Sequence, residues 1–98
     1  MPRYDLHRLR DGELVVDVQS DFVSRTAGRV VVPLLPRADM PQPTPRLHPV
    51  VVFEGADYIV ATHLISAVPA HVMGPPLGSL RGEGERLTRA LDTLLSDW

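Results

Sequence analysis

Two β-branched runs lie close together near the start of this chain: Leu14-Val15-Val16-Asp17-Val18-Gln19-Ser20-Asp21 and, after one turn, Gly28-Arg29-Val30-Val31-Val32-Pro33-Leu34. Valine favours strands because its branched side chain packs well on a pleated, half-buried surface. The two runs therefore predict neighbouring strands. Antiparallel pairing is the simplest arrangement, because the connection between them is short and Thr26-Ala27-Gly28 supplies a turn.

Further short strands are expected on both sides of this pair. Residues 4–9 alternate weakly and lead into Arg10-Asp11-Gly12-Glu13, whose Asp-Gly step predicts a hairpin. Residues 50–54 and 57–62 flank a second hairpin signal, Glu54-Gly55-Ala56-Asp57, and short apolar segments follow at 65–68 and 70–73. Six or seven short strands in a meander are typical of a mainly β protein, a small sandwich or barrel.

Two segments read as irregular. Residues 36–49 contain five prolines, which support neither a central strand nor a helix, so a surface loop is expected there. Gly74-Pro75-Pro76 also interrupts the pattern, and residues 74–78 are predicted to form a turn.

The end of the chain changes to a helical period. Glycines at 82 and 84 weaken the start of a helix, because glycine disfavours a helix interior. One amphipathic helix is therefore expected over about residues 81–96. Its apolar stripe consists of Leu87, Leu91, Leu94, Leu95 and Trp98.

Composition narrows the class of protein. The 98 residues are predicted to form one domain, and 44% hydrophobic with 22% charged residues is ordinary for a globular fold. The chain has no cysteine, which excludes disulfides and sulfur-ligated metals and fits a cytoplasmic setting. No apolar run is long enough to span a membrane. The ten arginines are spread among twelve acids, so no basic stripe for a nucleic acid is expected.

Few residues present a pattern with chemistry of its own. Asp17 lies in a valine-rich run, and because an isolated buried carboxylate is costly we expect it to pair with Arg29 or a backbone amide. The four histidines lie on separate segments without the spacing of metal ligands, so no metal site is expected. Phosphate loops and nucleophile elbows are absent too, and no cofactor is expected.

The opening runs resemble the CcdB family of toxin–antitoxin modules, small proteins that bind and poison bacterial DNA gyrase. Leu47-His48-Pro49-Val50-Val51 resembles the family's Leu-Tyr-Pro-Val-Val, and Ser66-Ala67-Val68-Pro69 resembles its Ala-Ser-Val-Pro. Tyr58 falls where the family carries an aromatic residue. These landmarks keep nearly constant spacing over most of the chain, which makes the resemblance specific.

The resemblance implies an SH3-like β-barrel with a small extra antiparallel sheet and one C-terminal helix, assembled as a homodimer. It also implies a non-enzymatic toxin that binds the gyrase A subunit and traps the gyrase–DNA cleavage complex. A cognate CcdA-like antitoxin would neutralise it, and DNA would be contacted only indirectly, through a toxin–antitoxin complex that represses its own operon.

Carried over by position, the family's gyrase-binding surface falls on two segments. The loop contributes Ser20, Phe22 and Val23, and the tail contributes Asp92, Leu95, Ser96, Asp97 and Trp98. Phe22 and Val23 also suit the core or a dimer interface, and Trp98 also suits packing against Leu91 and Leu94. The tail departs from the family's Trp-Gly-Ile ending, because the aromatic residue comes two positions later and Asp97 adds a charge.

Two other functions remain open from the sequence. A MazF-like endoribonuclease would share the fold but would need arginine, acid and hydroxyl groups over a basic RNA groove, and the acidic balance and missing motifs of this chain argue against it. A degenerate toxin would keep the antitoxin pairing without poisoning gyrase.

Overall fold

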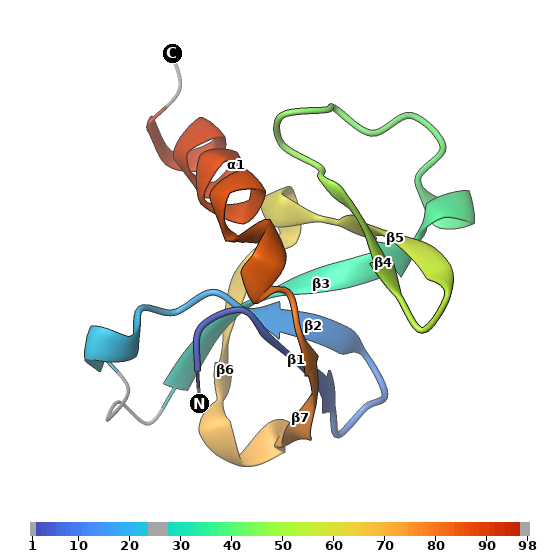
Figure 1. Ribbon diagram of the computed structural model, residues 1–98. Coiled ribbons are helices and arrows are strands. Elements are labelled where there is room, and N and C mark those ends of the chain that lie inside the picture. The colour runs from blue at the N-terminus through green and yellow to red at the C-terminus, as the bar shows by residue number, and fades with distance from the viewer. Residues whose placement is uncertain (1, 24–27, 97–98) are drawn as a thin grey trace.

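The computed structural model describes residues 2–23 and 28–96, and the fold is a curled antiparallel sheet with one helix (Figure 1). The strand order is β4-β5-β3-β2-β1-β7, with β6 also paired to β3. This is the predicted mainly β architecture, a half-closed barrel with a small additional sheet and a C-terminal helix.

The first hairpin forms where the sequence predicts it. β1 (Asp5–Leu9) and β2 (Leu14–Asp17) are antiparallel, with Leu6 opposite Val16. All four residues of β2 are buried. The strand lacks the usual apolar-polar alternation because the sheet is covered on both faces.

β3 (Gly28–Pro36) joins the two parts of the sheet. Its first half pairs with β6 (Ser66–Pro69), its middle pairs with β2, and its last three residues pair with β5 (Ala56–Val60). β5 and β4 (Val50–Phe53) form the small extra sheet, a hairpin whose turn places Glu54 and Gly55 at positive φ. The 3-10 turn η2 (Arg37–Asp39) and an irregular segment connect β3 to β4.

The segment predicted as a turn at 74–78 is instead part of β7 (Met73–Ser79), which pairs with β1. Two register shifts interrupt this pairing, and β7 lies at the end of the strand order. An edge strand tolerates Pro75 and Pro76 because one side of its backbone needs no partner. A side chain at Gly74 would lie 2.8 Å from the Arg8 carbonyl oxygen, so glycine permits the close approach of the two strands.

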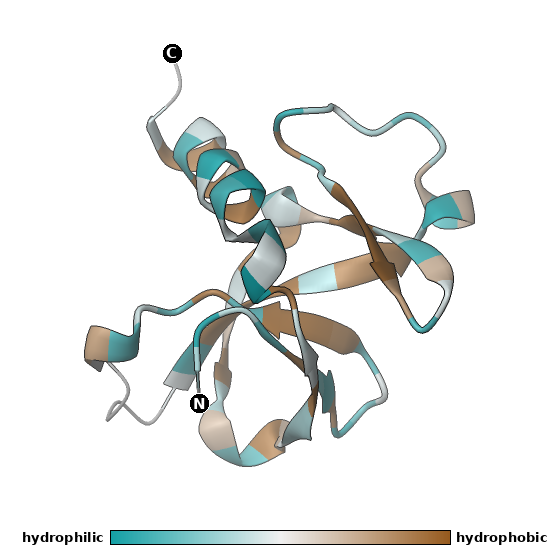
Figure 2. Ribbon diagram, in the orientation of Figure 1, coloured by the Kyte–Doolittle hydropathy of each residue, from teal (hydrophilic) through white to brown (hydrophobic). Residues whose placement is uncertain are grey.

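Three further 3-10 turns connect the remaining elements. η3 (Thr62–Leu64) follows β5, η4 (Ala70–Val72) leads into β7, and η5 (Arg81–Glu83) leads into the helix α1 (Gly84–Ser96). The hydropathy pattern puts apolar residues on the inner side of α1 and polar residues on its outer side (Figure 2). Leu87 is buried and Leu91 and Leu94 are half-buried, but Leu95 is 75% exposed and so is not part of the stripe that packs inward.

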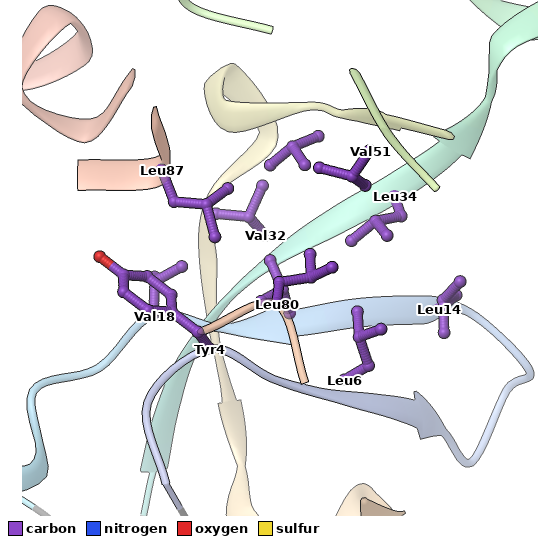
Figure 3. Close-up of a cluster of buried hydrophobic side chains, with 11 residues drawn as sticks. Tyr4, Leu6, Leu14, Val18, Val32, Leu34, Val51, Leu80 and Leu87 are labelled. Carbon is purple, nitrogen blue, oxygen red and sulfur yellow. The ribbon is translucent and has the colours of Figure 1, made fainter. Parts of the chain in front are cut away.

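The main core lies between the curled sheet and α1. Figure 3 shows Leu87 of the helix above Val32 of β3, with Tyr4 and Leu80 between the layers. The Tyr4 hydroxyl lies 2.6 Å from Thr88 Oγ1, which ties the start of the chain to the helix. A second cluster, Leu9, Val15, Val31 and Met73, covers the opposite face of β2 and β3.

Candidate functional site

A buried ion pair fixes the end of β2. Asp17 Oδ2 accepts hydrogen bonds from Arg29 Nε at 2.9 Å and lies 2.7 Å from the second guanidinium nitrogen, while Oδ1 accepts from the Gln19 amide at 3.0 Å. The prediction of a structural pairing for Asp17 is therefore confirmed. Because both side chains are almost completely buried, removing one partner would leave a buried charge at high cost, and the pair offers no accessible reactive group.

The predicted loop surface begins directly after this pair. Ser20 is half-buried and its hydroxyl accepts from the Phe22 amide, which shapes the 3-10 turn η1 (Asp21–Val23). The Phe22 side chain is 99% exposed, so the alternative of a core position for Phe22 is wrong for the single chain. Val23 closes the turn.

The predicted tail surface lies elsewhere in the molecule. Asp92, Leu95 and Ser96 are exposed in the last turns of α1, whereas Asp97 and Trp98 lie outside the described residues. Figure 1 shows η1 and the end of α1 well apart. One chain therefore does not bring the two predicted segments together, and the combined surface stays a prediction that depends on a second subunit.

A groove lies between the 44–46 segment and the outer side of α1. Its volume is about 600 Å³, within the size range of small-ligand sites. Two of the predicted tail residues lie in its wall. The lining residues are Thr44, Pro45 and Arg46 from the loop and Arg89, Asp92, Thr93 and Ser96 from the helix.

Arginines from two distant parts of the sequence meet at this groove. Arg46 and Arg89 also line a second hollow that continues the first, together with Arg86. Arg86 donates to Glu83 Oε1 at 2.7 Å and to the Val50 carbonyl at 2.8 Å, which anchors its guanidinium. Across residues 2–23 and 28–96, neither Arg46 nor Arg89 forms an ion pair. The expectation that no basic surface forms is therefore wrong at this groove, because folding gathers arginines that are separated in sequence.

Hydrogen-bond acceptors lie beside the arginines in the groove. Thr93 Oγ1 donates to the Arg89 carbonyl and Ser96 Oγ donates to the Asp92 carbonyl. These hydroxyls keep their lone pairs for a ligand that donates hydrogen bonds, while Asp92 presents an exposed carboxylate. The groove thus combines cationic donors, hydroxyl acceptors and one acid.

Two histidines hold the loop side of the groove in place. His48 is buried, and its Nδ1 accepts a hydrogen bond from the Thr44 amide at 2.9 Å. His48 Nε2 lies 2.8 Å from Nδ1 of the exposed His63 in η3, with the rings edge to face. Their contact could not be foreseen from the sequence, because the two histidines are 15 residues apart and lack the spacing of metal ligands.

The Thr44 amide can only donate, and it therefore fixes the direction of the Thr44–His48 and His48–His63 hydrogen bonds. Because Nδ1 of His48 is an acceptor, a neutral His48 carries its proton on Nε2 and donates to His63 Nδ1. Burial, and then the neighbouring charge of His63, lowers the pKa of His48 below its ordinary value. In that arrangement Nδ1 of a neutral His63 is the acceptor.

In the described part of the chain, no group of three or more His, Asp or Glu side chains lies close enough to hold a metal ion. Of the helices formed there, none is both long and apolar enough to cross a membrane.

The geometry defines a class of small half-closed β-barrel with a helix packed against the sheet and an arginine-lined groove beside the helix. Comparison with known proteins gives a family: the CcdB protein model matches residues 3–97, so the chain belongs to the CcdB family, as the sequence resemblance indicated. No curated protein matches this chain in sequence.

Two solved structures from mycobacterial species share the fold. One is an endoribonuclease, with a TM-score of 0.77 and 20% identity over 97% of this chain and 90% of that chain. The other is an endoribonuclease in complex with its cognate antitoxin, with the same score and identity over 97% of this chain and 95% of that chain.

The expectation of a non-enzymatic inhibitor is corrected by these two structures, since both proteins are endoribonucleases. The motifs that carried the family resemblance lie mainly in strands and turns, such as β2, β3 and the segment around Val50. Strand residues specify the barrel, and the same barrel serves different activities. Those motifs therefore carried no information on whether the groove is catalytic.

Proposed function

We propose that this protein is an endoribonuclease, the toxin of a type II toxin–antitoxin system, and that a cognate antitoxin neutralises it. The observation that carries the proposal is the groove beside α1, where the guanidinium groups of Arg46 and Arg89 have no ion-pair partner among the described residues. Guanidinium groups bind phosphate through two parallel hydrogen bonds. Single-stranded RNA offers successive phosphates and exposed base edges to such a groove.

The groups in the groove match what RNA cleavage requires. The ribose 2′-hydroxyl attacks the adjacent phosphorus, so that an O2′–P bond forms while the P–O5′ bond breaks. The products are a 2′,3′-cyclic phosphate and a 5′-hydroxyl, whose oxygen takes a proton from water. Arg46 and Arg89 would stabilise the charge that grows on the phosphoryl oxygens, and Asp92 is our candidate for accepting the 2′-hydroxyl proton.

The two similar structures favour the endoribonuclease proposal. At 20% identity they share the fold, and the activity printed for them belongs to those proteins. One of them binds a cognate antitoxin, which favours an antitoxin partner here as well. We also propose that the protein is cytoplasmic and forms a homodimer. Sedimentation would detect the dimer as a species of about twice the 10.8 kDa chain mass.

Cleavage of a long single-stranded RNA in the presence of a metal chelator tests the proposed function. We expect the purified protein to produce fragments with 5′-hydroxyl ends, because the 2′-hydroxyl reaction needs no metal. The double variant Arg46→Gln with Arg89→Gln should lose at least about a hundredfold in rate, since it removes two phosphate-binding groups. Arg10→Gln is the matched control, because Arg10 is exposed on the distant β1–β2 turn.

The outcomes separate the candidate activities. RNA that stays intact at micromolar protein, together with gyrase trapped on cleaved DNA, would overturn the endoribonuclease proposal. Equal loss of rate in Arg10→Gln would place the RNA site elsewhere. Induction in a bacterium should arrest growth, and co-expression of the small reading frame just upstream should relieve the arrest if that frame encodes the antitoxin.

A further inference from the structure

The loop side of the groove is a compact turn closed by a histidine side chain. The Thr44 carbonyl accepts from the amides of Leu47 and His48, at 2.9 and 2.8 Å, while the Thr44 amide donates to His48 Nδ1. These three hydrogen bonds close the turn formed by residues 44–48. Pro45 and Arg46, which line the groove, are the residues between its hydrogen-bonded ends.

The same histidine fastens the turn to the rest of the molecule. His48 Nε2 and His63 Nδ1 are 2.8 Å apart, and His63 belongs to η3, which packs against β3 and α1. On its other side, the Pro49 carbonyl accepts from the Val60 amide of β5 at 2.9 Å. The His48–His63 contact is thus a side-chain link between the 44–48 turn and the barrel.

This link is compatible with two neutral rings only. A proton on His48 Nδ1 would replace the acceptor of the Thr44 amide with a donor. A proton on His63 Nδ1 would face the proton that His48 carries on Nε2. Protonation of either ring therefore breaks one hydrogen bond of the chain.

The surrounding charges offer no compensation for an imidazolium. In the described part of the chain, no hydrogen bond or ion pair joins a carboxylate to either ring. His63 is the only titratable residue of η3. The charged or titratable side chains on the neighbouring elements are Arg29 in β3, which pairs with Asp17, Arg46 in the turn, Asp57 and Tyr58 in β5, and Glu85, Arg86, Arg89 and Asp92 in α1.

We propose that the His48–His63 pair is a proton-sensitive latch, which holds the 44–48 turn against η3 when both rings are neutral and releases it when one ring gains a proton. The pKa of His48 is lowered in the fold, mainly by burial and then by His63. A lowered pKa means that the latch is closed above the ordinary histidine range and opens as the pH falls through the pKa of the folded state. One consequence rests on the proposed function: release of the turn also releases Arg46 from its place in the groove.

Hydrogen exchange of the Thr44 amide in the full chain tests the latch directly. After correction for the intrinsic exchange rate, we expect protection of this amide to fall about tenfold per pH unit below the His48 pKa, as one bound proton requires. Nitrogen shifts of the rings should report His48 with its proton on Nε2 at neutral pH. In His48→Asn, the amide oxygen replaces Nδ1 as an acceptor that does not titrate, so the protection of Thr44 should no longer depend on pH.

Two further variants keep the test decisive if His48→Asn fails to fold. His63→Asn retains an acceptor at the Nδ1 position and removes a like charge, so the His48 pKa should rise. His71→Gln removes an exposed histidine of η4 and should leave the Thr44 profile unchanged. Protection of Thr44 that stays constant through the His48 titration would overturn the latch. If Thr44 protection stays constant but the protein cleaves RNA, the latch is wrong and the proposed function stands. If Thr44 protection follows the His48 titration but the protein does not cleave RNA, the proposed function is wrong and the latch stands.

Discussion

At the scale of single residues, the buried Asp17–Arg29 pair is the contact with the largest consequence for stability. Asp17→Asn keeps the shape of the side chain and an acceptor for the Gln19 amide, but it removes the carboxylate charge that faces the buried guanidinium of Arg29. We expect the free energy of unfolding in urea to fall by about 3–5 kcal/mol, the usual cost of breaking a buried pair.

The matched control for this substitution is Glu83→Gln. It breaks the Arg86–Glu83 pair, in which both side chains are more than a third exposed. Exposed pairs contribute about 0–1 kcal/mol, so the control should unfold almost like the original chain. Equal losses in the two variants would contradict a stabilising role for burial of the Asp17–Arg29 pair.

At the scale of elements, β7 depends on a glycine because its backbone passes close to β1. Gly74→Ala would place a methyl group 2.8 Å from the Arg8 carbonyl oxygen, so one strand must shift. We expect a loss of about 1–3 kcal/mol in thermal or urea unfolding, as for other overpacked sites. Gly82→Ala in η5 meets no atom within 4 Å and should be neutral or slightly stabilising. A neutral Gly74→Ala would mean that the β1–β7 register shifts absorb the methyl group.

At the scale of the whole molecule, the distribution of charge matters more than its sum. The formal net charge is -2, yet the groove beside α1 brings three arginines together. Binding of single-stranded RNA by two or three phosphate contacts should give a slope of log K against log salt of about −1.4 to −2.1. Fluorescence anisotropy at several salt concentrations measures it. Substitution of both Arg46 and Arg89 by glutamine should flatten the slope, Arg10→Gln should not, and a slope unaffected by either would contradict RNA binding in this groove.

The amino-acid sequence by itself determined most strand runs, the two hairpins, the helical tail and the need of Asp17 for a partner. These features follow from short-range rules, since β-branched residues, Asp-Gly turns and helical spacing act over a few positions, and a buried carboxylate requires a partner. Only the tertiary structure decided that β7 runs through Gly74-Pro75-Pro76, that Arg46 meets Arg89 and that His48 meets His63. Each of these depends on the path of the chain between distant segments, because close approach and shared burial are properties of the packed barrel.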